Sequence, residues 1–140
     1  WAPMAEQKAV ANFLNNNAAV DSFLVHFKEE LFTRLTRIYE GFLQLKNDGF
    51  NVDAVAPQAA IYLTVQLDLA GKKADDGTIL ETQSAVTAYV LNEAKLALVP
   101  FNAFGADKNN SWYRLSVGRC KKEEIETMLQ KLRNALEKLS

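Results

Sequence analysis

One arginine in this sequence stands where it could bind an anionic ligand. Residues 112–117 alternate in polarity, which is typical of a strand with one buried face. Arg114 falls on the opposite face, which it shares with Trp112 and Ser116. A planar guanidinium can bind both oxygens of a carboxylate at once. Arg114 is therefore a candidate carboxylate-binding residue, although an ordinary solvent-facing arginine would give the same pattern.

The other reactive residue types do not form a catalytic set. His26 is the only histidine and falls inside a helical pattern with no cysteine near it, so we interpret it as structural. Cys120 is the only cysteine, which excludes an internal disulfide and a thiolate metal cluster. It precedes a predicted helix, whose N-terminus could lower the thiol pKa, but it has no histidine partner in the sequence. The sequence therefore predicts no catalytic residue and no metal ligand.

The elements that position these residues follow from hydrophobic periodicity. Apolar residues spaced by threes and fours indicate helices, and a period of two indicates strands. Gly41, inside the long second helix, is expected to permit close approach of a neighbour. These patterns predict an α+β fold, a small and mostly antiparallel sheet with helices packed on one face, preceded by a long helix. Helices are predicted over 4–14, 18–48 and 121–139. A further helix is predicted to begin at a capping box formed by Thr78 and Glu81 and to end near Lys95. Strands are predicted over 60–67, 96–99, where Pro100 stops the strand, and 112–117.

Composition narrows the functional classes. The 140 residues are 49% hydrophobic, enough for one core, and 16 basic residues balance 17 acidic ones. This balance argues against a nucleic-acid or membrane partner, and no long apolar run or signal peptide is recognised. The single cysteine favours the cytoplasm. Because the sequence opens with Trp1-Ala2-Pro3 rather than Met and enters a helical pattern at once, we expect it to be a fragment.

Several short segments occur in an order that is typical of one family. They are Glu6-Gln7-Lys8-Ala9, Pro57-Gln58-Ala59-Ala60-Ile61-Tyr62, the run from Leu91 to Pro100, Phe104-Gly105, and Tyr113-Arg114-Leu115-Ser116 before a final amphipathic helix. Together they resemble the C-terminal part of fold-type I, class I/II aminotransferases, the aspartate-aminotransferase-like enzymes that depend on pyridoxal phosphate. The sequence differs from the family pattern at Phe101 and Ala59, where glycine is usual.

The resemblance implies a role for each part of the chain. Residues 1–17 would be the remnant of the large-domain helix, and residues 18–140 the small domain, with Arg114 binding the substrate α-carboxylate. The parent would be a homodimer that moves an amino group between an amino acid and a 2-oxo acid. The Schiff-base lysine and the other cofactor contacts of the family lie in its large domain, so this chain is expected to bind no pyridoxal phosphate and to be inactive alone.

Two alternatives stay open at this point. The parent could perform other pyridoxal-phosphate chemistry on the same fold, such as that of a β-lyase or a decarboxylase. The chain could instead be a free-standing α+β interaction module, which its size and composition permit. The sequence does not identify the amino acid substrate.

Overall fold

The computed structural model describes residues 2–140, so Trp1, the first residue of the predicted large-domain remnant, lies outside the described residues. The chain divides into two compact units, one that extends to Thr33 and one over Arg34–Ser140. The predicted domain boundary between residues 17 and 18 stays a prediction. Among residues 2–140, no helix combines the length and apolar character that crossing a membrane requires.

The first unit consists of α1 (Met4–Leu14) and the first half of α2 (Asn17–Asn47). Both helices were predicted, and the break between them falls in the asparagine run as expected. In this unit the apolar stripe predicted for α2 is exposed at Leu24 and Phe27 and is buried only at Leu31. The rings of Phe23 and Phe27 stack with centroids 5.7 Å apart. With a single buried residue over 2–33, the described part of this unit forms no core of its own.

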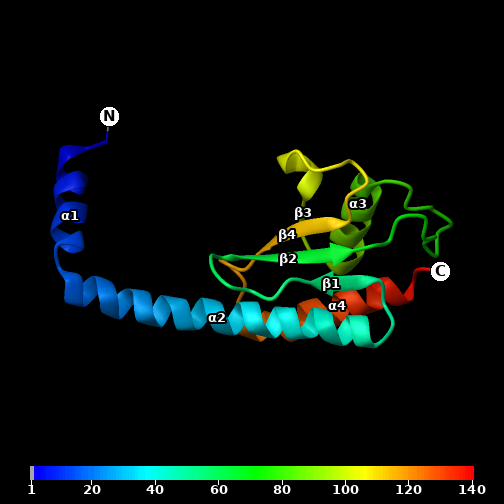
Figure 1. Cartoon of the computed structure of the whole chain (residues 1–140), viewed down its shortest axis with the longest axis horizontal. Coiled ribbons are helices and arrows are strands. Elements are labelled where there is room, and N and C mark those ends of the chain that lie inside the picture. The colour runs from blue at the N-terminus through cyan, green and yellow to red at the C-terminus, as the bar shows by residue number, and fades with distance from the viewer. Residues whose placement is uncertain (1) are drawn as a thin grey trace. The chain divides into compact units, whose positions relative to one another are not determined.

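The second unit is built around a four-stranded antiparallel sheet in the order β1-β2-β4-β3 (Figure 1). Its strands are β1 (Val52–Ala54), β2 (Tyr62–Leu67), β3 (Val99–Pro100) and β4 (Trp112–Ser116). The helices of this unit are residues 34–47 of α2, α3 (Gln83–Ala94) and α4 (Ile125–Glu137), with short 3₁₀ turns η1 (Phe101–Phe104) and η2 (Lys122–Glu124). The α+β prediction is confirmed.

The core lies against one face of this sheet. Alternate strand residues are buried, among them Leu63 and Val65 of β2 and Tyr113 and Leu115 of β4. Each helix adds buried apolar residues at helical spacing, namely Ile38, Phe42 and Leu45 of α2, Val86 and Val90 of α3, and Ile125, Leu132 and Leu136 of α4. The other face of the central strands is left for Arg114 and its neighbours.

The close approach predicted at Gly41 is present between α2 and α4, which lie side by side in Figure 1. A Cβ atom on Gly41 would meet the side chain of Leu129. Arg37 binds Glu126 at 2.8 Å on one side of this contact, and Arg133 binds Asp48 on the other. Ion pairs thus hold this part of the chain against α4 on both sides of Gly41.

The predicted start of the third helix is wrong. Thr78 and Glu81 do not form its cap, because Thr82 is the N-cap and accepts a hydrogen bond from Ala85 N at 3.2 Å. Residues 71–80 instead fold back on themselves, with Leu80 N donating to Lys72 O at 2.9 Å. These backbone groups are already paired in the turn, so they cannot serve a helix. The helix ends where expected, with Lys95 left-handed at φ 56°.

Three further elements differ from their predictions. The strand predicted over 96–99 is only Val99–Pro100, and Pro100 belongs to it because β3 is an edge strand, where proline need not donate to the ladder. The edge strand β1 was missed, since three residues give too short a pattern. The last helix begins at Ile125, because Lys122–Glu124 form a 3₁₀ turn.

Candidate functional site

Arg114 lies on the open face of the sheet, as the strand alternation predicted. Its strand β4 runs between β2 and β3, and its Cα partners are Thr64 on one side and Val99 on the other. The residues before and after it in β4, Tyr113 and Leu115, are buried on the opposite face, whereas Arg114 is half-buried. Paired strands on both sides hold its backbone rigidly.

Two aromatic rings enclose the guanidinium of Arg114. Its Cζ lies 4.4 Å from the ring centroid of Tyr62, in β2, and 4.7 Å from that of Phe104, at the end of η1. Because β2 and η1 flank β4 on different sides, the rings approach from different sides. Guanidinium groups stack favourably on aromatic faces through the ring quadrupole. The aromatic neighbours therefore fix the plane of the guanidinium while leaving its N–H edge available.

The donors of this guanidinium are not used within the described chain. Among residues 2–140, the guanidinium of Arg114 forms no hydrogen bond and no ion pair. Arg37 and Arg133 differ in this respect, since Arg37 binds Glu126 of α4 and Arg133 binds Asp48 in the turn after α2. A half-buried guanidinium loses part of its hydration, so a free N–H edge in this position favours an anionic partner.

The chain leading into β4 is held by a buried side chain that the sequence analysis did not single out as functional. Gln83, only 7% exposed, donates from Nε2 to the backbone oxygens of Asn110 and Trp112, the latter at 3.3 Å. The side chain of Asn110 accepts from Trp112 N at 2.7 Å. These bonds fix the strand two residues before Arg114. A buried polar residue on the apolar stripe of α3 was the only sequence signal.

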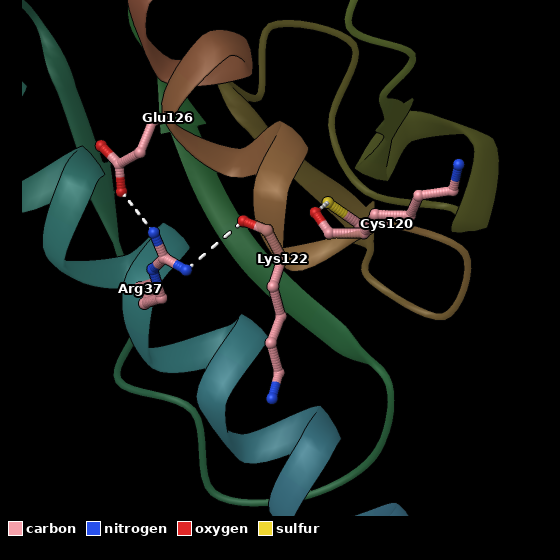
Figure 2. Close-up of polar contacts among 5 residues, drawn as sticks. Arg37, Cys120, Lys122 and Glu126 are labelled. Atoms are coloured by element: carbon pink, nitrogen blue, oxygen red, sulfur yellow. Dashed lines mark hydrogen bonds and ion pairs between the residues drawn. The ribbon is translucent and has the colours of Figure 1, made fainter.

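Cys120 lies in the turn before η2, two residues ahead of Lys122, whose backbone oxygen accepts a hydrogen bond from Arg37 (Figure 2). Its thiol donates weakly to Lys121 O at 3.5 Å. Burial raises the pKa of the Cys120 thiol, the Glu124 carboxylate raises it further, and Arg34 opposes them. The helix N-terminus therefore does not activate this cysteine. Nucleophilic catalysis by Cys120 is not supported.

His26 lies in the other unit of the chain. It is exposed on α2, within the first unit, so it is not a core residue. No second histidine and no cysteine accompanies it on α2, so nothing on that helix supplies a catalytic partner.

The chain is similar in sequence and in fold to known aminotransferases. It is similar to the probable aspartate/prephenate aminotransferase of Rickettsia typhi, with 35% identity over 75 residues, covering 53% of this chain and 18% of the relative. The aspartate aminotransferase of Rhizobium meliloti shares the fold with a TM-score of 0.71 and 26% identity, covering 84% of this chain and 28% of that one. A PLP-bound putative aminotransferase from Clostridium difficile 630 matches at 18% identity and a TM-score of 0.66, covering 89% and 28%.

The class defined by these likenesses is that of the aminotransferase-like α+β domains. The model of the family "Aminotransferase class I and II" matches residues 1–132, and the chain belongs to this family. It spans less than a fifth of the length of the curated relative described above and less than a third of each solved structure. The family resemblance recognised in the sequence is confirmed.

The strand residues around Arg114 do not include the amine that pyridoxal phosphate requires. That cofactor needs a lysine amine for its aldehyde and a cradle for its phosphate. The four described strands contain no lysine. Lys46 binds Asp53 at 2.6 Å and Lys138 binds Glu93 at 2.7 Å, so these two amines are engaged elsewhere. The site on this chain fits a carboxylate better than it fits the cofactor.

Proposed function

We propose that this chain is the C-terminal part of a pyridoxal-phosphate-dependent aminotransferase and that Arg114 binds the α-carboxylate of its substrate. One observation carries the proposal, namely a half-buried guanidinium on the open sheet face, enclosed by two rings and without a hydrogen-bond or ion-pair partner among residues 2–140. Arginine in such a setting can donate two parallel hydrogen bonds to the two oxygens of one carboxylate.

In this function Arg114 acts by positioning. With its carboxylate fixed at the N–H edge, an amino acid retains only rotation about the bond between its carboxylate carbon and Cα. Restricting that rotation presents the Cα–H bond to a base supplied by another part of the protein and converts a chance encounter into an oriented one. Pyridoxal phosphate supplies the electron sink in such enzymes. The amino group would then move between an amino acid and a 2-oxo acid.

Other parts of the enzyme would supply the groups that this chain lacks. We infer that the lysine that bonds the cofactor, the large domain and the dimer partner are contributed from outside these 140 residues, and that the enzyme works in the cytoplasm. The chain alone is then inactive. Incubation with pyridoxal phosphate, borohydride reduction and peptide mass mapping should give only slow, scattered lysine labelling. Saturable labelling of one lysine would contradict this part.

The role of Arg114 is tested in the whole enzyme to which we propose that this chain belongs. Arg114→Ala should lower kcat/KM for amino acids by several powers of ten, because both binding and orientation are lost. Arg114→Lys should recover only part of it, since an ammonium group cannot reproduce the bidentate geometry. Arg119→Ala removes another arginine and is the matched control. Wild-type kinetics in Arg114→Ala, or turnover that does not depend on a 2-oxo acid, would refute the assignment.

A further inference from the structure

The ring that covers one side of Arg114 is itself held by a second ring. Phe104 is 58% exposed, so the core does not fix its orientation. The half-buried ring of Phe101 meets it edge to face, with centroids 6.4 Å apart and planes at 80°. Edge-to-face aromatic pairs are favourable because the positive ring edge faces the negative ring face. Phe101, Phe104 and Arg114 thus form a continuous row.

The backbone of η1 produces this pairing. In a 3₁₀ turn the side chains at positions i and i+3 lie above one another, so Phe101 and Phe104 share one side of the turn. Gly105 ends the turn at φ 90°, a left-handed conformation, and its N–H bonds to Asn102 O at 3.1 Å. Ala106 N closes the loop on Phe101 O at 3.2 Å. The turn is therefore short and closed by backbone hydrogen bonds.

Tyr62 needs no such support, because it is set directly in the central strand β2 and pairs with Ser116 of β4. Phe104 comes from a turn at the edge of the sheet. The two covers of the guanidinium are thus held differently, Tyr62 by the sheet and Phe104 by a turn and an aromatic neighbour.

We propose that Phe101 is a positioning residue, which orients Phe104 over Arg114 and so keeps the guanidinium edge directed at the carboxylate. The inference rests on the proposed function of Arg114. Without the Phe101 ring, Phe104 samples other rotamers and Arg114 loses one of its two covers. Cation–π contacts at exposed sites contribute about 0.5–1 kcal/mol, which corresponds to an affinity change of about two- to fivefold.

The test uses the 140-residue chain and nuclear magnetic resonance of the Arg114 side chain. In the wild type, the ring currents of Tyr62 and Phe104 should shift the Arg114 Hε and Hδ signals upfield. Phe101→Gly should remove a large part of that shift, as Phe104→Leu does directly. Phe101→Tyr keeps an aromatic edge and should retain it. Unchanged backbone amide shifts in β2 and β4 would exclude general unfolding as the cause.

Titration with sodium acetate separates this inference from the function on which it rests. Acetate should move the Arg114 Hε signal, with a dissociation constant about two- to fivefold higher in Phe101→Gly than in the wild type or Phe101→Tyr. If Phe104→Leu alters the Arg114 signals and Phe101→Gly does not, the positioning role is refuted. If Phe101→Gly alters them but acetate perturbs Arg114 in none of the proteins, the carboxylate-binding proposal fails instead.

Discussion

Replacing Gly41 by alanine should change the free energy of unfolding through the contact between α2 and α4. A Cβ atom added there would lie 2.7 Å from Leu129 Cδ2 and 3.0 Å from its Cγ, against an optimum of about 3.5–4.0 Å between carbon atoms. The Leu129 side chain must therefore move by roughly 1 Å. The ion pairs on either side of the contact oppose separation of α2 and α4. Crowding of this kind costs about 1–3 kcal/mol.

A helix propensity term of the opposite sign competes with this clash. Replacing glycine by alanine inside a helix contributes about 1 kcal/mol of stability. The net expectation is that Gly41→Ala lowers the free energy of unfolding by about 1 kcal/mol, measured by urea denaturation with circular dichroism. In the background of Leu129→Ala the clash is gone, so the same substitution should raise stability by about 1 kcal/mol.

The reversal of sign between the two backgrounds is the decisive result. Urea curves of the wild type, the two single variants and the double variant form a cycle that isolates the interaction between positions 41 and 129. Equal m-values in all four proteins would verify that the unfolded state is unchanged. If Gly41→Ala stabilises the protein while Leu129 is present, close approach is not the reason for this glycine.

Two further predictions concern polar groups. A hydrogen bond from Lys46 holds the pKa of Asp53 below its ordinary value of 3.8. The stability that this pair contributes is therefore present above pH 3.8 and is lost as the pH falls through the lower pKa of the folded state. In urea denaturation, Asp53→Asn should lose less stability below pH 4 than the wild type does, and an equal dependence of stability on pH in the two proteins would contradict the pairing. Gln83→Glu sets an acceptor against two backbone carbonyls and should cost about 1–3 kcal/mol at pH 8. Part of that loss should return at pH 5.5, where the buried acid is protonated, and a loss independent of pH would count against the assigned hydrogen bonds.

Much of the fold could be predicted because its signals are local and repeated. The long apolar stripe from Leu31 to Leu45 and the alternation of Leu63 and Val65 each recur several times within one element. The start of α3 could not be predicted in this way. A capping-box pattern at Thr78 precedes the true cap at Thr82, and the choice between them depends on the folded-back turn of residues 71–80.

The candidate site was likewise predictable only in part. Strand parity alone placed Arg114 on the open face, since every second residue of a strand points the same way. Its aromatic neighbours could not be inferred, because Tyr62 and Phe104 reach it only through the register of β2 against β4 and through an unpredicted 3₁₀ turn. The buried pairing of Gln83 likewise depends on a loop brought back from a distant part of the chain.

The strand order has a consequence for how this polypeptide acquires its shape during translation. β2 pairs with β4, yet α3 and β3 are synthesised between them. Until β4 has left the ribosome, β2 keeps one unsatisfied edge, and its buried face can be covered only in part. Such non-local pairing is slow to form. Nascent chains that stop short of β4 should therefore depend on chaperones, and the sheet should close only after β4 has been synthesised.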